Sequence, residues 1–282
     1  MSWQHLPEKI SPVLFTLGPL QIRWYSVMYL VAFALTYLLV LYRIKKERHY
    51  PYSQEIVIDA ILWCILGLMV GARLGYVVIY NFSYYLARPW EIILPFHFSS
   101  EGVKLVGLSG MSYHGGAIGV VVTGFLYCRA HRISFWNMAD LFCPAIPLGY
   151  TFGRLGNFLN GELFGRPTQL PWGMYFPLDP TGLLRHPSQL YEALFEGVFL
   201  FSLLWLVRNK HPFEGWLLSL YLIGYGLVRF FIEFFREPDP QIGFIVGFLT
   251  MGQILCLIMV AIGVGLYLWR RSVGLKTHGT QP

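Results

Sequence analysis

The sequence predicts an all-α polytopic membrane protein with about seven transmembrane helices. Of its 282 residues, 55% are hydrophobic and 13% are charged, whereas soluble domains carry about 25% charged residues. Several apolar stretches are long enough to cross a bilayer, which takes about 20 residues. Basic residues gather in short segments between these stretches. Together these observations exclude an ordinary soluble enzyme and an intrinsically disordered chain.

The predicted spans follow the apolar stretches in order along the chain. They cover about residues 22–42, 56–80, 113–129, 138–158, 190–207, 216–235 and 244–269. A helix of this length, at about 1.5 Å per residue, matches a hydrocarbon core of about 30 Å. Glycine, proline and polar residues interrupt the third and fourth stretches, which are therefore the least regular.

Basic residues set the predicted orientation, because Lys and Arg collect in loops on the cytoplasmic side of a membrane. They gather in short segments at residues 43–48, 129–132, 208–210 and 270–276. With these segments inside, the amino terminus is periplasmic and the carboxyl terminus is cytoplasmic, as an odd number of spans requires. The longer segments at about 81–111 and 161–189 are then extracytoplasmic and are expected to form a small cap.

We expect the whole chain, residues 1–282, to form a single integral membrane domain. Its first twenty residues lack the basic region and cleavage site of a signal peptide. The net charge of +6 comes without a basic patch interleaved with aromatics, so nucleic acid is not an expected partner. The cysteines lack metal-ligand spacing and are expected to be buried free thiols, with no metal site: Cys64, Cys128, Cys143 and Cys256.

Ionisable residues within the predicted spans point to function, because each costs about 2.5–3.5 kcal/mol at a helix centre. Arg154 and Asn157 share one helix face with Gly161. An arginine beside an amide can clamp a phosphate oxygen. Alternatively, Arg154 forms a polar contact between helices, paired with Asp140 or Glu192.

Two further pairs of charges follow in the fifth and sixth predicted spans. Arg229, Glu233 and Arg236 lie at spacings of four and three. Arg229 and Glu233 either neutralise each other, or Arg229 is a second phosphate ligand that Glu233 orients. Glu192 and Glu196 lie four apart on one helix face, which implies a cationic neighbour or a protonated carboxyl. General acid or base catalysis by these glutamates is a further possibility.

His114 lies at the outer end of the third predicted span, within Ser112–Gly116. Histidine titrates near pH 6.5 and can accept a proton at neutral pH. The flanking glycines leave room for a substrate to approach the ring. The alternative is a histidine with a purely structural role.

These groups together favour an anionic amphiphile as the ligand, with its charged head at the arginines and its tails in lipid. The sequence contains no hydrolase motif, P-loop or dinucleotide fingerprint. An enzyme that acts on a phospholipid at the outer leaflet fits, and so does a phospholipid transporter or flippase with an anionic-headgroup site. A transporter predicts inverted repeats and paired broken helices, and neither is evident in the sequence, which favours the enzyme.

Five short motifs contain most of these polar residues. They are RWYS at residues 23–26, HGG at 114–116, GRLGNFLNGE at 153–162, RHPSQLYEA at 185–193 and RFFIEFFR at 229–236. Together they resemble the motifs of the bacterial phosphatidylglycerol:prolipoprotein diacylglyceryl transferase family. The similarity extends from about Gly18 to Gln253 with the motifs in the order of the family. No motif position departs from the family pattern, and the long third motif is highly specific.

The resemblance implies a reaction at the bacterial inner (cytoplasmic) membrane. Members of this family move the sn-1,2-diacylglyceryl group from phosphatidylglycerol to the lipobox cysteine thiol of a prolipoprotein signal peptide. A thioether forms and glycerol phosphate is released. The resemblance implies no metal and no cofactor. The substrates are phosphatidylglycerol and the signal peptide in the lipid bilayer, and the active site of this multi-pass protein faces the periplasmic side.

The resemblance also assigns roles to residues. His114 is the candidate base for the thiol, or it orients the lipid. Arg154 and Arg229 are expected to neutralise the charge that develops on the leaving phosphate. The substrate supplies the nucleophilic cysteine, so none of the chain's own cysteines is required. The residues expected to bind substrate are Tyr25, Asn157, Glu162, Gly165, Tyr225, Glu233 and Arg236.

Overall fold

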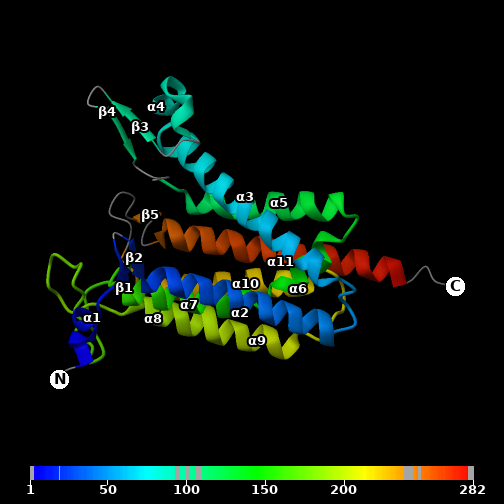
Figure 1. The fold of residues 1–282 in the computed structure, drawn as a ribbon. Coiled ribbons are helices and arrows are strands. Elements are labelled where there is room, and N and C mark those ends of the chain that lie inside the picture. The colour runs from blue at the N-terminus through cyan, green and yellow to red at the C-terminus, as the bar shows by residue number, and fades with distance from the viewer. Residues whose placement is uncertain are drawn as a thin grey trace. The chain divides into compact units, whose positions relative to one another are not determined.

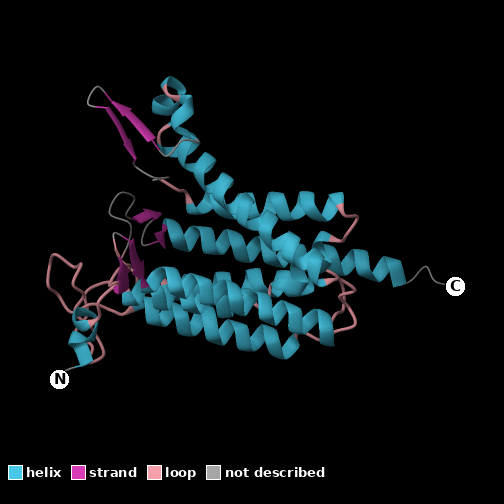
Figure 2. Cartoon of the chain, viewed as in Figure 1, coloured by secondary structure: helices cyan, strands magenta, loops and turns pink. Residues whose placement is uncertain are grey.

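The computed structural model describes residues 3–18, 20–92, 96–99, 102–105, 110–237, 244–246 and 249–278. The chain divides into two compact units (Figure 1). The first unit consists of Met1–Tyr50 and Ala139–Pro282, and the second of Pro51–Met138. Helices dominate both units, and the strands in the described part of the chain form short two-stranded sheets (Figure 2). The predicted helical class is therefore confirmed.

The first unit packs its longer helices side by side. They are α2 (Trp24–Lys46), α7 (Ile146–Leu159), α10 (Trp216–Ile232), α11 (Met251–His278) and a continuous helical stretch of α8 (Ser188–Tyr191), η3 (Glu192–Phe199) and α9 (Leu200–Val207). The middle segment, η3, is a π-helix. Helix α2 packs on α7, α7 on η3, and α10 on α11. Because η3 also packs on α10, polar residues of α7, η3 and α10 come together in one place.

Shorter elements complete the first unit. They are η1 (Trp3–His5), α1 (Leu6–Lys9), the antiparallel pair β1 (Val13–Leu17) and β2 (Leu20–Arg23), and the antiparallel pair β5 (Phe244–Val246) and β6 (Leu249–Thr250). Helix α6 (Phe135–Phe142) continues from the second unit into the first. The loop over residues 161–187 packs on the end of α7 through a small core, in which Met174 and Phe176 of the loop meet Phe158 of α7.

The second unit is built on α3 (Gln54–Tyr80) and α5 (Tyr113–Ala130). It also contains α4 (Phe82–Ala87), η2 (Pro89–Ile92) and the antiparallel pair β3 (Phe96–Ser99) and β4 (Gly102–Leu105). The two long helices meet at glycines. A Cβ atom at Gly71 would overlap the carbonyl oxygen of Gly115, and one at Gly119 would overlap that of Gly67. Such small residues let the backbones of membrane helices approach closely.

Four helices in the described part of the chain are long and apolar enough to cross a membrane. They are Trp24–Lys46, Gln54–Ile79, Ser188–Val207 and Met251–Leu275, and Trp216–Ile232 is a shorter apolar helix. The chain is thus a polytopic helical membrane protein.

The fourth predicted span, at 138–158, is wrong as a single helix. Helix α6 ends at Phe142 and α7 begins at Ile146. Pro144 and Pro147 fall at this break, and proline removes a backbone N–H and clashes with the preceding turn of a helix.

The last predicted span, at 244–269, begins too early. Phe244–Val246 is a strand, residues 247–248 lie outside the described part, and α11 begins at Met251. The Thr250 hydroxyl accepts a hydrogen bond from the Gln253 backbone N–H at 3.2 Å, and the Gln253 side chain accepts one from the Thr250 N–H at 3.0 Å. This reciprocal capping box fixes the start of the helix. The sixth predicted span ends too late, because α10 stops at Ile232 and not at residue 235.

A buried polar network lies where α2 ends. Arg43 is fully buried and donates hydrogen bonds to the Glu47 carboxylate at 2.8–3.0 Å and to the carbonyl oxygens of Asp140 and Leu141 at 2.7 and 2.6 Å. The Asp140 carboxylate accepts hydrogen bonds from the backbone N–H groups of Gly215 and Leu218 at 2.7 and 2.9 Å, which caps the start of α10. The network ties α2, α6 and α10 together.

Candidate functional site

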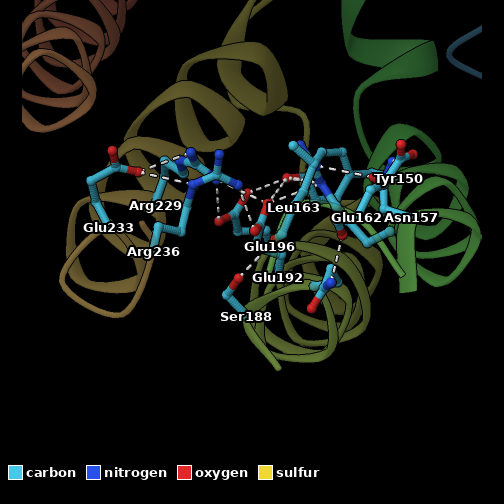
Figure 3. A network of polar contacts seen from close by, with 12 residues as sticks. Tyr150, Asn157, Glu162, Leu163, Ser188, Glu192, Glu196, Arg229, Glu233 and Arg236 are labelled. Carbon is cyan, nitrogen blue, oxygen red and sulfur yellow. Dashed lines mark hydrogen bonds and ion pairs between the residues drawn. The ribbon is translucent and has the colours of Figure 1, made fainter. Parts of the chain in front are cut away.

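Three arginines and three glutamates form one polar cluster inside the first unit (Figure 3). Its charged members come from α7, η3, α10 and the turn that follows α10, and they are Arg154, Glu192, Glu196, Arg229, Glu233 and Arg236. The formal charges of these six groups cancel. Buried charges in such numbers are stable only when they are paired in this way.

Glu192 lies at the centre of the cluster. Its side chain is 0% exposed, and its carboxylate pairs with Arg154 Nε at 2.9 Å, Arg229 Nη1 at 2.9 Å and Arg236 Nη1 at 2.7 Å. Among the described residues, no other side chain pairs with all three arginines. The predicted alternative in which Arg154 contacts Glu192 is therefore confirmed, whereas Asp140, the other suggested partner, caps α10 instead.

Tyr150 and Arg154 lie one turn apart on α7 and extend the cluster. The Tyr150 hydroxyl donates to Glu196 Oε2 at 2.6 Å and accepts from Arg154 Nε at 2.7 Å. The Arg154 guanidinium also lies 4.8 Å from the centroid of the Tyr150 ring, a cation–π contact. Arg154 Nη1 donates to Asn157 Oδ1 at 3.2 Å, and Asn157 Nδ2 donates to Glu162 Oε1 at 2.9 Å. The chain of polar contacts thus continues along α7 into the 161–187 loop.

Arg229 connects all three glutamates of the cluster. Its Nη1 atom lies 2.9 Å from Glu192 and 3.4 Å from Glu196, and its Nη2 atom lies 2.9 Å from Glu233. The Glu233 carboxylate also accepts a hydrogen bond from the Thr250 hydroxyl at 3.3 Å. The predicted pair of Arg229 and Glu233 is present, and Arg229 also contacts two glutamates of the π-helix.

Arg236 is fixed by contacts to its backbone as well as by the ion pair of its side chain. Gly165 and Arg236 form an antiparallel bridge, and Arg166 donates hydrogen bonds to the carbonyl oxygens of Phe235 and Arg236 at 2.9 and 2.7 Å. A Cβ atom at Gly165 would overlap the Phe235 carbonyl oxygen and lie 2.9 Å from His186 Cβ. The structure therefore gives the predicted site residue Gly165 a close backbone contact beside Arg236.

The 161–187 loop is fixed by a buried ion pair. Arg185 donates hydrogen bonds to both oxygens of the Asp179 carboxylate, at 2.7 and 3.0 Å, and it pairs with Glu237 at 2.9 Å. Burial by itself raises the pKa of Asp179, but the hydrogen bonds from Arg185 and Thr181 outweigh it and lower the pKa to about 2. Asp179 therefore stays ionised, and the loop that carries Glu162 and Gly165 is held against the turn after α10.

Two tyrosines among the predicted site residues flank the cluster. A Cβ atom at Gly156 would lie 3.3 Å from Tyr25 Cδ2, so Tyr25 packs on α7 between the positions of Arg154 and Asn157. The Tyr225 ring meets the Tyr150 ring edge-on, with their centroids 6.0 Å apart.

His114 belongs to the second unit, at the amino end of α5, where its side chain is exposed. Ser112 caps this helix by accepting a hydrogen bond from the Gly115 N–H at 3.3 Å. The other predicted site residues all belong to the first unit. The catalytic role of His114 stays a prediction.

The sequence did not identify three residues of the cluster as part of the site, namely Tyr150, Glu192 and Glu196. Tyr150 went unnoticed, although it lies four residues before Arg154 and hence on the same face of α7. Glu192 was considered only as an acid or base or as a partner of Arg154. Two glutamates four apart in an apolar stretch were the signal, but the sequence does not show how many cations surround them.

The arginines form the accessible side of the cluster. Their side chains are 19%, 15% and 18% exposed for Arg154, Arg229 and Arg236, whereas Glu192 and Glu196 behind them are 0% exposed. A guanidinium carries five N–H donors and can bind a carboxylate and a second anion at once. The arrangement suits an oxyanion such as a phosphate. Within the described residues, no group of three His, Cys, Asp or Glu side chains is placed to hold a metal ion.

Comparison with known proteins matches this chain over nearly its full length. A family model described as prolipoprotein diacylglyceryl transferase matches residues 12–269. A phosphatidylglycerol–prolipoprotein diacylglyceryl transferase from Chlorobaculum tepidum is 52% identical over 270 residues, which is 96% of this chain and 93% of the relative. Proteins of the same name from Wolinella succinogenes and Desulfotalea psychrophila are 46% and 44% identical, covering 92% and 96% of this chain and 93% and 96% of the relatives.

Proposed function

Since the chain belongs to the prolipoprotein diacylglyceryl transferase family, we propose that the arginine–glutamate cluster binds the phosphate of phosphatidylglycerol during diacylglyceryl transfer. The protein is a transferase whose substrates are phosphatidylglycerol and a prolipoprotein. The family match and the names of the relatives favour this activity over the transporter that the sequence left open. The exposed edge of the three guanidiniums, with the glutamates behind it, is the observation that supports the phosphate site.

The proposed reaction is a substitution at carbon. The sulfur of the lipobox cysteine attacks the glyceryl carbon that is bonded to the phosphate oxygen. A C–S bond forms, the C–O bond breaks, and glycerol phosphate leaves with the electron pair while the thiol proton passes to a base. Negative charge therefore builds up on the phosphate in the transition state, and we expect Arg154 and Arg229 to neutralise it. Preorganised charges of this kind supply several kcal/mol in a dry site.

The neighbours of the arginines are proposed to shape the headgroup pocket. Asn157 has two amide N–H donors, one of which goes to Glu162, and we assign the other to a phosphate or glycerol oxygen. Glu233 holds Arg229 in orientation. Tyr25 and Tyr225 line the pocket beside α7 and α10.

We propose that both units form one integral membrane domain in the bacterial inner membrane, with seven crossings and the arginine cluster toward the periplasm. The carboxyl ends of α2, α9 and α11 lie at one end of the first unit (Figure 1). Basic residues occur in the last turn of α2, directly after α9 at Arg208, and in α11 at Arg270 and Arg271. Arg208 at the end of α9 lies 3.2 Å from Glu47 at the end of α2. Shared basic ends favour the cytoplasm. The segments at about 81–111 and 161–189 are then extracytoplasmic.

A direct assay tests the function. The purified protein in detergent is incubated with phosphatidylglycerol and a peptide that carries a lipobox cysteine, and the peptide is read by mass spectrometry. We expect the mass of one diacylglyceryl group on the cysteine, release of glycerol phosphate, and no addition to the matched peptide with alanine at that position. An unmodified cysteine peptide, with lipid only bound or moved between leaflets, would favour the transporter.

Replacing His114 with glutamine (H114Q) is expected to lower the transfer rate mainly near neutral pH. A free thiol has a pKa of about 8.5, so at alkaline pH the substrate thiolate forms without a base and the rate should recover. The ratio of wild-type to variant rates, measured from pH 6.5 to 9.5, checks this. A deficit that is constant over this range would mean that His114 positions the lipid and does not take the proton.

Removing all four cysteines is expected to leave transfer measurable, because the nucleophile belongs to the prolipoprotein. The thiols are free, and Cys128, Cys143 and Cys256 are buried while Cys64 is partly buried. Changing them to alanine or serine creates only small cavities or buried hydroxyls, which lower stability more than the rate. The variant should also form the thioether product. Complete loss of transfer in a folded variant would implicate a thiol of the enzyme itself.

Replacing Gly165 with alanine (G165A) is expected to reduce transfer about 100-fold, the cost that a misplacement of about 1 Å can have in an active site. The added Cβ would push the loop away from Phe235 and move the backbone bridge at Arg236. The matched control is Gly153→Ala, because a Cβ atom at Gly153 meets no atom within 4 Å. Equal activities of the two alanine variants would contradict the proposed contact.

A further inference from the structure

We propose that Glu192 is a positioning residue that holds the three arginines of the phosphate site in the arrangement that the reaction requires. This inference rests on the function proposed above. In this arrangement a single buried carboxylate aligns guanidiniums that come from different parts of the fold.

The contacts of Glu192 place it between those parts. Arg154 comes from α7, Arg229 from α10 and Arg236 from the turn after α10. The Glu192 carboxylate lies within 2.7–2.9 Å of all three guanidiniums. In the described residues, it is the one side chain that joins Arg154 directly to the two arginines at the end of α10. A carboxylate has about four lone-pair sites and can serve three donors at once.

The local structure of the helix supports this role. Glu192 is the first residue of the π-helix η3, which breaks the α-helical stretch between α8 and α9. Segments of π-helix are rare and occur frequently at functional sites. At Gly197 the π-helix approaches α7 so closely that a Cβ atom would overlap the Thr151 hydroxyl. This close packing brings the Glu192 and Glu196 carboxylates within hydrogen-bond reach of Tyr150.

Two consequences of removing the Glu192 charge have opposite signs. The cluster gains one formal positive charge, so it should bind an anion more tightly in the ground state. The arginines also lose their shared partner, so they should stabilise the transition state less. Only interactions that are stronger in the transition state than in the ground state raise the rate. A general loss of structure would weaken binding and catalysis together.

The experiment compares two substitutions at Glu192. For each we measure kcat, the KM for phosphatidylglycerol and the inhibition constant of glycerol phosphate, which is the leaving group. In Glu192→Gln we expect kcat to fall about 100-fold through misalignment, while glycerol phosphate inhibits about tenfold more tightly because of the extra positive charge, about 1.4 kcal/mol. In Glu192→Asp the charge is kept and the reach is shorter. There kcat should fall while the inhibition constant stays near that of the wild type.

Glu196 and Glu47 provide matched controls. Glu196 is equally buried but reaches only Arg229, at 3.4 Å, among the three arginines. Its change to glutamine should tighten glycerol phosphate inhibition and lower kcat by less than about tenfold. Glu47 is buried and pairs with Arg43, about 33 Å from Tyr25 along α2 at 1.5 Å per residue. Changing Glu47 to glutamine should alter neither kcat nor the inhibition constant of glycerol phosphate.

The outcomes separate the two proposals. A kcat for Glu192→Gln within about threefold of the wild type, or equal losses in Glu192→Gln and Glu196→Gln, would overturn the positioning role while leaving the function intact. If Glu192→Gln does not fold, the kcat of Glu192→Asp provides the test. A kcat equal to that of the wild type in Glu192→Asp would overturn the inference. A wild-type protein that modifies no peptide and does not bind glycerol phosphate would overturn the proposed function itself.

Discussion

Replacing Arg229 with alanine is expected to reduce diacylglyceryl transfer to background. The guanidinium pairs with Glu192, Glu196 and Glu233, so its loss leaves buried carboxylates short of a partner and removes a charge from the phosphate site. Loss of one group that stabilises developing charge costs about 10²–10³ in rate. The unbalanced negative charge would also repel the anionic headgroup. Transfer to a lipobox peptide, followed by mass spectrometry, measures the loss.

Two further variants test whether the loss of activity is specific to the guanidinium of Arg229. Arg229→Lys keeps the charge but cannot form the forked contacts of a guanidinium, so it should recover only a small part of the activity. Arg270 is equally exposed, at 15%, and pairs with Glu214. Its change to alanine should leave transfer near the wild-type level. Near-normal turnover in folded Arg229→Ala would place the phosphate elsewhere.

Replacing Arg154 with alanine is expected to have an effect of similar size for a different reason. Arg154 is the arginine that α7 contributes, and it joins Tyr150, Asn157 and Glu192. Its loss removes a phosphate ligand and disconnects Asn157 from the cluster. Because residues that act as a unit have non-additive effects, the double variant with Arg229→Ala should be no slower than either single variant.

The measurement is the same transfer assay, with thermal unfolding to show that the variant is folded. Tyr150→Phe is the informative companion, because it keeps the ring under Arg154 and removes the hydroxyl between Arg154 and Glu196. It should retain much more activity than Arg154→Ala. If the two variants were equally inactive, the Tyr150 hydroxyl would be as essential as the Arg154 guanidinium.

The sequence predicted the helices and the polar residues because both are local properties. Apolar stretches of sufficient length predicted α2, α3 and the helical stretch Ser188–Val207. The break at Pro144 and Pro147 was visible as an irregularity. The sequence alone did not show that the two sides of this break are separate helices, because a proline can also kink a membrane helix without ending it.

The partners of the charges could not be predicted in the same way. The pairs that Glu192 forms with Arg229 and Arg236 span 37 and 44 residues, and they depend on which helices pack together. The pair of Arg229 and Glu233 lies within one turn and was predicted from spacing alone. The sequence around Glu192 carries no local signature that distinguishes a π-helix from an α-helix. Gly165 was recognised as a site residue, but its neighbour Phe235 lies on a distant segment.

The balanced charges of the cluster also bear on how the protein is made. During synthesis Arg154 leaves the ribosome 38 residues before Glu192 and 75 before Arg229, by their positions in the chain. An arginine in an apolar helix is costly until it has a partner. The cluster can therefore close only after the segment up to Arg236 has entered the bilayer. Assembly of the helices and completion of the active site then become one event, and a chain that stops before Glu192 would expose an unpaired arginine to quality-control proteases.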